Sequence, residues 1–198
     1  VELYASYPRA VCDCLMNILG THDTERILTA LAGADPEGKS NDELAHLRLS
    51  DDARAYGTAL LKLASVLQYT LYGFPSVFYG DEAGIEGYRD PFCRMPFPWG
   101  SENGELLAHY RTLGRLRREH SAFAGGDFRI TAHDCGLFAY TREDENEIIH
   151  IALNRASFPI HFDFGERWTN LFTGEDGSGT AVLEPCGFRI IQVKKKGQ

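Results

Sequence analysis

The stretch Asn17-Ile-Leu-Gly-Thr-His22-Asp23-Thr24 decides the fold assignment of this chain. An apolar, strand-like run ends here in an adjacent His and Asp, and a helix-like segment follows. Enzymes with parallel barrels keep their chemistry at the carboxyl ends of buried strands. His22 and Asp23 are therefore candidate site residues. The rest of the chain offers no second strand-end carboxylate that obviously completes a catalytic pair, so the sequence predicts only part of an active site.

Composition narrows the class of protein. The chain has 198 residues, of which 43% are hydrophobic and 24% charged, as in an ordinary globular protein with one large or two small domains. The formal net charge is −8, and no stripe of Lys and Arg alternates with aromatic residues, so no nucleic-acid partner is expected. No apolar run reaches the roughly 18 residues of a membrane span, so no membrane partner is expected either.

The five cysteines are odd in number, and the chain is long enough to form a core without disulfides. A reducing compartment and a cytoplasmic location are the expectation. Cys12-Asp-Cys14 with nearby His22 could form a metal site, but zinc sites usually place two to four residues between cysteines and need four ligands. Small buried hydrophobic side chains are the preferred interpretation, and no metal or cofactor is expected.

Helix and strand signals alternate over residues 1 to about 122. Strands are predicted at residues 14–19 and 76–79, and helices at residues 25–32, 50–72 and 105–120, with Ser50 as the cap of the middle helix. Residues 33–49 read as a polar connection. This order of buried strands and helices is typical of βα units.

The pattern changes at Ala124-Gly125-Gly126. From residue 127 to residue 193 the sequence predicts about seven short strands, including a hairpin whose turn lies at residues 143–146. Frequent turns between short strands favour an antiparallel sandwich. Tyr140, Trp168 and Phe188 are predicted core residues. The predicted fold class is α/β plus all-β, with the boundary between residues 123 and 124.

Three ordered motifs resemble the α-amylase family of glycoside hydrolases, known as family 13. The segment from Asn17 to Arg26 resembles the fourth of the family's four signature regions. Gly73-Phe-Pro-Ser-Val-Phe-Tyr-Gly-Asp81-Glu82 is similar to the segment that forms its eighth barrel strand. Asp90-Pro-Phe-Cys-Arg94, followed by Phe97-Pro-Trp99, resembles the branch of neopullulanases, cyclomaltodextrinases and related α-glycosidases.

The resemblance implies a fold and an activity. Residues 1–123 would be the seventh and eighth βα units of a TIM (β/α)8 barrel, and residues 124–198 the β-sandwich domain that follows it. The parent would hydrolyse or transfer α-1,4 or α-1,6 glucosidic bonds with retention, and its partner would be an α-glucan or maltooligosaccharide. Retaining glycosidases use two carboxylates about 5 Å apart. In this family both lie upstream of the seventh strand, so the isolated chain is predicted to be inactive.

The resemblance also gives roles to four residues. Asp23 would be the carboxylate that stabilises the transition state, and His22 would donate to a hydroxyl of the same sugar. Both could instead cap the helix that follows them. Asp90 and Arg94 would contact a neighbouring glucose unit, or form a plain salt bridge in their loop.

Other residues near these motifs have less specific interpretations. Asp81 and Glu82 are expected to be structural, and Arg26 to be the partner of a local carboxylate. Four aromatic residues could either stack on sugar faces or pack locally: Tyr88, Phe92, Phe97 and Trp99.

Two other functions remain open: a stand-alone carbohydrate-binding sandwich and a non-enzymatic amylase-like protein. Titration with maltooligosaccharides would separate the first from the leading hypothesis, and no binding or only weak binding is expected. An opened barrel would leave unpaired strand edges, so the chain is expected to self-associate.

Overall fold

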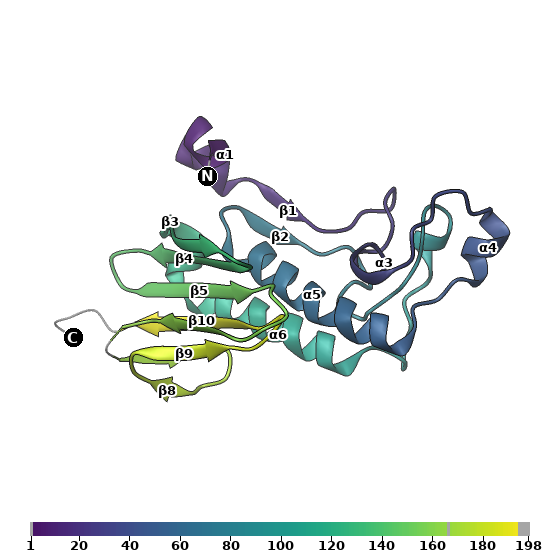
Figure 1. Cartoon of the computed structure of the whole chain (residues 1–198). Coiled ribbons are helices and arrows are strands. Elements are labelled where there is room, and N and C mark those ends of the chain that lie inside the picture. The colour runs from purple at the N-terminus through teal and green to yellow at the C-terminus, as the bar shows by residue number, and fades with distance from the viewer. Residues whose placement is uncertain (1, 166, 194–198) are drawn as a thin grey trace. The chain divides into compact units, whose positions relative to one another are not determined.

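The structure is a computed structural model that describes residues 2–165 and 167–193 (Figure 1). Packing divides the chain into two compact units. Unit 1 consists of Val1–Asn17, Tyr69–Phe74 and Thr112–Gln198, and unit 2 of Ile18–Gln68 and Pro75–Arg111. The two units interleave along the chain, so a sequential boundary near residue 124 stays a prediction about domains. Residues 166 and 194–198 of the predicted second domain lie outside the described part.

The described part of the chain begins with helices and ends with strands (Figure 1). The helices are α1 (Glu2–Ser6), α2 (Arg9–Asp13), α3 (Ile27–Ala32), α4 (Asn41–His46), α5 (Asp51–Thr70), α6 (Gly104–Glu119) and α7 (Ser121–Gly125), with the 3₁₀-helix η1 (Phe92–Arg94). The strands are β1 (Met16–Ile18), β2 (Phe74–Ser76), β3 (Asp127–Asp134), β4 (Leu137–Glu143), β5 (Ile148–Asn154), β6 (Ile160–Asp163), β7 (Trp168–Asn170), β8 (Asp176–Gly177), β9 (Thr180–Leu183) and β10 (Phe188–Val193).

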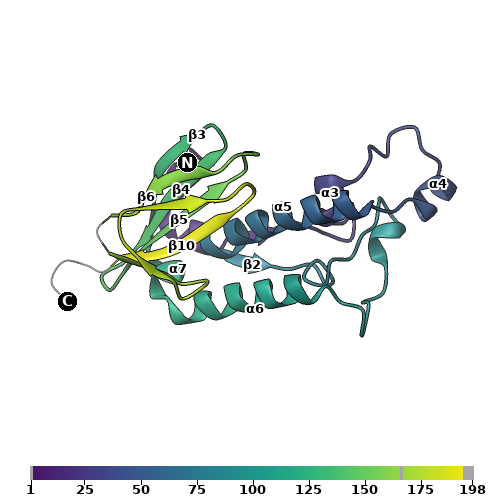
Figure 2. The same cartoon turned by 60° about the horizontal axis from the view of Figure 1, so that its bottom comes forward.

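Unit 1 contains two antiparallel sheets. Six strands pair in the order β3-β4-β5-β10-β7-β8, and β6 pairs with β9 (Figures 1 and 2). The predicted hairpin is present as β4 and β5, where Glu143 pairs with Ile148. Its turn is closed by the Asp144 carboxylate, which accepts hydrogen bonds from the amides of Asn146 and Glu147. Side-chain closure of this kind is why Asp is favoured in turns.

The core of unit 1 includes apolar side chains from both sheets. Its buried members are Ala139, Ala152, Phe164, Trp168, Ala181, Leu183 and Ile191. Ala181 and Leu183 belong to β9, so the smaller sheet shares its apolar face with the larger one. This antiparallel, two-sheet arrangement is consistent with the predicted sandwich.

The structure of residues 127–193 differs from the prediction in the number of strands and in the burial of Phe188. Among the described residues this segment holds eight strands rather than about seven, because the two-residue β8 was not foreseen. Such a short strand leaves no alternating pattern to read. Tyr140 and Trp168 are buried as predicted, whereas Phe188 is only half-buried, against the ring of Phe172.

Helix α5 begins as predicted. The Ser50 hydroxyl accepts a hydrogen bond from the Ala53 amide at 3.2 Å, and Asp51 and Asp52 lie in the first turn. There, negative charge complements the partial positive charge of the helix N-terminus. The buried apolar side chains of unit 2 include Leu28, Leu44, Leu61, Val66, Ile85 and Leu106.

Helix α4 corrects the prediction that residues 33–49 form only a polar connection. Ser40 and Glu43 make a reciprocal capping box at its N-terminus. The Ser-x-x-Glu spacing that produces such a box was readable in the sequence and was missed.

The two strands of the first half are shorter than predicted. Strand β1 replaces residues 14–19, because Cys14 and Leu15 turn back onto α2 through their amides. The predicted strand 76–79 is wrong by about two residues, since β2 ends at Ser76. The Tyr79 carbonyl accepts from the Arg26 guanidinium instead of a neighbouring strand. β1 and β2 form a two-stranded sheet.

The cysteines are all free thiols, but they do not all behave as small buried hydrophobic groups. Cys12 is buried in α2, and its thiol lies near the carbonyls of Tyr4 and Tyr7. Cys14 is exposed, which corrects the prediction for this residue. Within the described ranges, none of the helices has the length and apolar character that crossing a membrane requires.

Candidate functional site

The loop between β1 and α3 presents His22 and Asp23 to solvent. Thr21 shapes the loop, because its hydroxyl accepts from the Asp23 amide at 3.2 Å and its own amide donates to the Thr24 hydroxyl at 3.2 Å. The side chains of His22 and Asp23 are 66% and 70% exposed. The N-cap of α3 is Arg26, with no side-chain capping bond, so the alternative in which His22 and Asp23 cap this helix is not observed.

Arg94, in η1, brings the predicted site residues together within unit 2. Its Nε lies 2.8 Å from Asp90 Oδ1 and donates to the His22 carbonyl at 3.1 Å. Its Nη2 lies 3.6 Å from Asp23 Oδ1. His22 Nε2 is in turn 3.3 Å from Asp23 Oδ2. We call these four residues, His22, Asp23, Asp90 and Arg94, the Arg94 cluster.

The Arg94 cluster combines hydrogen-bond donors and acceptors on an accessible surface. Carboxylates only accept hydrogen bonds, whereas a guanidinium only donates and an imidazole can donate. Such a set matches vicinal hydroxyl groups, which need both. Exposed ion pairs contribute only about 0–1 kcal/mol to stability, so folding alone gives little reason for this arrangement. The salt bridge considered as the alternative for Asp90 and Arg94 is present, and Arg94 also lies close to Asp23.

The His22 carbonyl connects the Arg94 cluster to the buried core of unit 2. It accepts from Arg94 Nε and also lies 3.3 Å from the Cys93 thiol. Cys93 is fully buried, so the position of the His22–Asp23 loop is tied to the core. Cys93 was not predicted as a functional residue, because its role depends on a contact with a residue 71 positions away in the sequence.

Arg26 ties together the segments that carry the cluster. Its side chain is fully buried, its Nε donates to the Cys93 carbonyl at 2.5 Å, and its Nη1 donates to the Tyr79 carbonyl at 2.5 Å. Nη1 also lies 3.4 Å from Asp81 Oδ1. The guanidinium carbon is 4.2 Å and 4.6 Å from the ring centroids of Phe78 and Tyr79, within cation–π range. Arg26 is therefore the partner of a local carboxylate, as predicted.

Asp81 is a buried acid with a structural environment. Burial raises the pKa of Asp81 to about 6, although the Arg26 guanidinium opposes this shift. A Cβ atom on Gly20 would lie 2.8 Å from Asp81 Oδ2, so any larger residue there would displace the buried Asp81 carboxylate. Neighbouring Glu82 accepts from the Gly80 amide at 2.8 Å. Both contacts agree with the structural interpretation of these acids.

The raised pKa of Asp81 predicts a specific pH dependence of stability. A folded pKa of about 6, above the ordinary value of 3.8, gives a contribution that is complete below about pH 4 and is lost as the pH rises through 6. The loss corresponds to about 3 kcal/mol. We expect wild-type stability, relative to that of Asp81→Asn, to fall by this amount between pH 4 and pH 7 in urea unfolding. The exposed control Asp42→Asn should show no such trend, and a flat Asp81→Asn difference would contradict the assignment.

The aromatic residues near the cluster differ in exposure. Tyr88 is buried, and its hydroxyl accepts from the Ala34 amide at 3.2 Å, so local packing is its role. Phe92 lines a cavity described below. Phe97 and Trp99 pair with ring centroids 4.5 Å apart, and Trp99 is 83% exposed.

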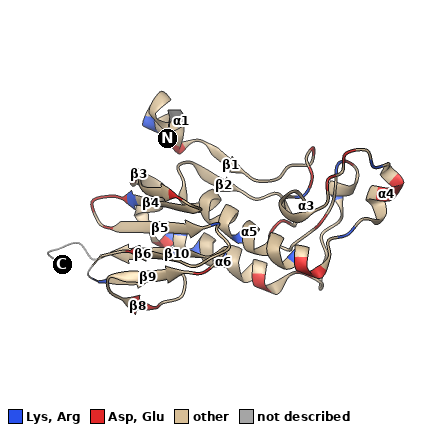
Figure 3. Cartoon of the chain, viewed as in Figure 1, with Lys and Arg blue, Asp and Glu red and all other residues tan. Residues whose placement is uncertain are grey.

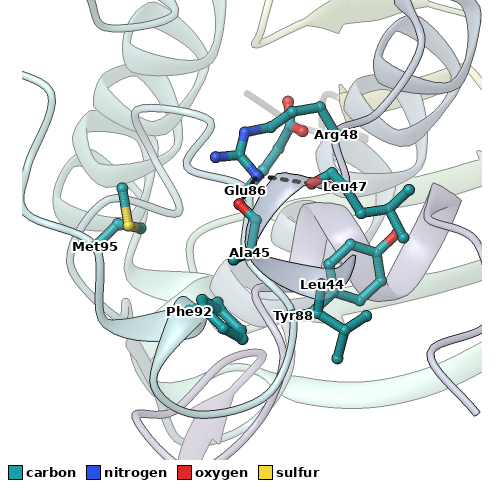
Figure 4. A pocket seen from close by; sticks show the side chains of 9 residues that line it. Leu44, Ala45, Leu47, Arg48, Glu86, Tyr88, Phe92 and Met95 are labelled. Atoms are coloured by element: carbon teal, nitrogen blue, oxygen red, sulfur yellow. Dashed lines mark hydrogen bonds between the residues drawn. The ribbon is translucent and has the colours of Figure 1, made fainter. Parts of the chain in front are cut away.

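A small cavity lies in unit 2 between α4 and the segment that leads to Arg94. Figure 4 shows the side chains that line it, with Phe92 and Met95 on the left of the view and Leu44, Arg48 and Tyr88 on the right. The Arg48 guanidinium donates to the carbonyls of Ala45 and Leu47. The volume of about 70 Å³ is far below the roughly 300–1,000 Å³ of ordinary ligand pockets. This cavity is therefore not a sugar site.

Neither a basic stripe nor a group of metal ligands is found among the described residues. Over residues 2–165 and 167–193, Lys and Arg are scattered along the ribbon and form no basic stripe (Figure 3). Among the described residues no group of three or more His, Cys, Asp or Glu side chains has the arrangement of a metal site.

Comparison with known proteins gives the family. No protein-family profile matches the chain. A cyclomaltodextrinase of Geobacillus thermopakistaniensis (strain MAS1) is 34% identical over 203 residues, covering 96% of this chain and 31% of the relative. The solved type III pullulan hydrolase of Thermococcus kodakarensis superposes with a TM-score of 0.78 and 28% identity, over 97% of this chain and 31% of that one. The chain belongs to the α-amylase family of glycoside hydrolases.

A further relative from this family has a similar extent of match. A maltogenic α-amylase of Bacillus acidopullulyticus is 31% identical over 201 residues, covering 94% of this chain and 30% of the relative. The chain thus spans about a third of the length of these members of the α-amylase family.

Proposed function

We propose that this chain is the C-terminal part of a retaining enzyme that hydrolyses or transfers α-1,4 or α-1,6 glucosidic bonds. Residues 1–123 would complete a catalytic (β/α)8 barrel as its seventh and eighth βα units, and residues 124–198 would form the sandwich domain. The similarity to a cyclomaltodextrinase and a maltogenic α-amylase supports this substrate class. The two-sheet antiparallel packing of β3 to β10 supports the sandwich.

The observation that carries this proposal is the Arg94 cluster. Asp23 and Asp90, which are far apart in the sequence, are both held by one guanidinium and remain more than half exposed. In the proposed site Asp23 accepts hydrogen bonds from hydroxyls of the glucose unit at the reaction centre, and His22 donates to the same unit. Asp90 and Arg94 bind the hydroxyls of the neighbouring unit.

Asp23 would act by binding the transition state more tightly than the substrate. The sugar ring gains positive charge as the glycosidic bond breaks, and a carboxylate that holds its hydroxyls opposes that charge. Hydrogen bonds to the 2-hydroxyl that strengthen at this point supply several kcal/mol in glycosidases. The nucleophilic Asp and the acid/base Glu belong to a part of the parent that this chain does not contain.

Exposed apolar residues on the two short strands support the proposed self-association. Met16 of β1 and Phe74 of β2 are 53% and 48% exposed, and β1 and β2 form a sheet of only two strands. Unpaired edges beside exposed apolar side chains favour pairing with another copy. Sedimentation velocity should show species larger than a monomer, and a single monomeric boundary at all concentrations would contradict this.

The structure gives less support to a stand-alone sugar-binding sandwich. Unit 1 has a hollow of about 450 Å³ lined by Arg167, Trp168, Thr169, Asp176, Gly177 and Ser178. Its tryptophan is only 6% exposed and donates through Nε1 to the Gly179 carbonyl, so little ring surface is free for a sugar. The intact Arg94 cluster likewise argues against the alternative of a non-enzymatic amylase-like protein, because such a protein need not keep side chains that bind sugar hydroxyls.

The proposed role of Asp23 predicts a large kinetic effect in the full-length parent. Asp23→Asn should lower kcat/KM at least about 100-fold on maltoheptaose, because several kcal/mol of transition-state binding are lost. The matched control is Asp42→Asn, an exposed Asp of the same unit, which should leave kcat/KM unchanged. The 198-residue chain itself should release no sugar. Hydrolysis by the pure chain, or full activity of Asp23→Asn, would refute the proposal.

A further inference from the structure

We propose that Phe97 and Trp99 form an aromatic platform that stacks on a glucose ring of an α-glucan bound at the Arg94 cluster. This proposal rests on the proposed function, because it extends the same sugar site by one further contact. The aromatic platform is defined by these two rings, whose centroids lie 4.5 Å apart at an angle of 49°.

The exposure of Trp99 is the first observation behind the platform. Its side chain is 83% exposed, whereas the other tryptophan of the chain, Trp168, is 6% exposed. An aromatic side chain carries about 150–250 Å² of largely apolar surface, which folding normally removes from water. The exposed indole of Trp99 therefore offers a broad apolar face on which a ligand can pack. The Phe97 ring supports Trp99 from one side and leaves most of its surface free.

The loop holds Trp99 in a fixed, outward position. The Ser101 amide donates to the Pro98 carbonyl at 2.9 Å, and Gly100 has a φ of +80°, the value required at the third position of a type II turn. Trp99 therefore occupies the second position at the tip of a tight turn. Pro96 and Pro98 restrict the backbone on either side. Because the turn already restrains the backbone at Trp99, ligand binding costs less backbone entropy there.

Both ends of the loop are anchored in unit 2, which also holds the Arg94 cluster. The Met95 carbonyl accepts from the Tyr79 hydroxyl at 2.9 Å, and the Asn103 amide donates to the Ala83 carbonyl at 3.0 Å. Five peptide steps join Arg94 to Trp99, so their Cα atoms lie within about 18 Å of each other. An oligosaccharide of a few glucose units spans such a distance.

A glucan fits the platform better than other ligands with flat faces. The faces of a glucose ring present C–H groups, which pack on the electron-rich face of an indole. Nucleic-acid bases also stack on aromatic rings, but their backbone requires basic side chains nearby. Arg94 is the one basic residue near Trp99 in the sequence: residues 95–110 contain no Lys or Arg, the acids Glu102 and Glu105 follow Trp99, and the whole chain has a net charge of −8.

The two tryptophans allow a direct test on the 198-residue chain. Iodide should quench exposed Trp99 and spare buried Trp168, and Trp99→Phe should remove the quenchable fraction. We expect maltoheptaose to reduce quenching of Trp99 at least about twofold, with a midpoint in the millimolar range, while sucrose at equal mass has no effect. In parallel, NMR titration should show about tenfold weaker maltoheptaose binding for Trp99→Ala. Tyr56→Ala, which removes another exposed ring of unit 2, should bind as the wild type does.

The outcomes separate this proposal from the proposed function. Binding that Asp23→Asn weakens, without protection of Trp99, overturns the platform and leaves the Arg94 cluster standing. Protection of Trp99 that is equal in wild type and Asp23→Asn supports the platform and contradicts the sugar-binding role of Asp23. The absence of any maltoheptaose binding overturns both. Protection that rises with protein concentration without sugar identifies a contact between copies and overturns the platform.

Discussion

Arg26→Met is expected to lower the free energy of unfolding by about 3–5 kcal/mol, among the largest effects of any substitution in this chain. The methionine fills most of the volume of the side chain but leaves the Asp81 carboxyl buried without its cation. The carbonyls of Tyr79 and Cys93 also lose their donors inside the core. Urea unfolding at pH 7, where Asp81 is ionised, measures the effect.

Two further variants test the reason for this loss. Removing both charges in Arg26→Met with Asp81→Leu should recover much of the stability, because no unpaired ion remains buried. Arg48→Met, at an exposed arginine that also binds carbonyls, should change the stability by no more than about 0.5 kcal/mol. Equal stability of Arg26→Met and wild type would contradict this account, because it would show that the buried Arg26–Asp81 pair does not stabilise the segments that carry the Arg94 cluster.

Arg142→Met is expected to cost about 3 kcal/mol through a different mechanism in unit 1. Arg142 is fully buried and donates to the carbonyls of Thr70 at 2.5 Å, Gly126 at 2.9 Å and Phe123 at 3.2 Å. Thr70 ends α5, and the other two lie at the end of α7, where the negative ends of helix dipoles favour a cation. Burial lowers the pKa of Arg142 to about 10, so the guanidinium remains charged at pH 7.

The control for Arg142 lies on the neighbouring strand. Arg129 of β3 is exposed, and Arg129→Met should change the midpoint of urea unfolding only slightly. Hydrogen exchange adds a local readout, because loss of Arg142 should speed exchange at the Gly126 amide, which bonds to the end of α7. Unchanged stability and exchange in Arg142→Met would mean that the carbonyls find other donors.

The elements that were predicted correctly are those whose determining contacts join residues close together in the sequence. The β4–β5 hairpin was predictable because its alternation and its Asp144 turn lie within a few residues of each other. The start of α5 was predictable because Ser50 caps its own helix. Strand β2 was displaced because the Tyr79 carbonyl bonds to Arg26, a partner 53 residues away that no local pattern reveals.

The candidate site residues could be named from the sequence, but the contacts between them could not. The adjacency of His22 and Asp23, and the spacing of Asp90 and Arg94, are visible in the sequence. Their association through Arg94 is a long-range contact that was not predicted, because the resemblance implied only that the two pairs bind neighbouring glucose units. Gly20 was not singled out, because the need for glycine arises from the approach of Asp81, which only the folded chain shows.

The proposed role of the Arg94 cluster is to bind the hydroxyl groups of an α-glucan. Residue-resolved NMR titration of the 198-residue chain with maltoheptaose tests it most directly. We predict amide shift changes concentrated at residues 21–24 and 90–94, weakened by Asp23→Asn and unchanged by Asp42→Asn. Shift changes confined to residues 127–193, or shift changes at the cluster that Asp23→Asn leaves intact, would contradict the account.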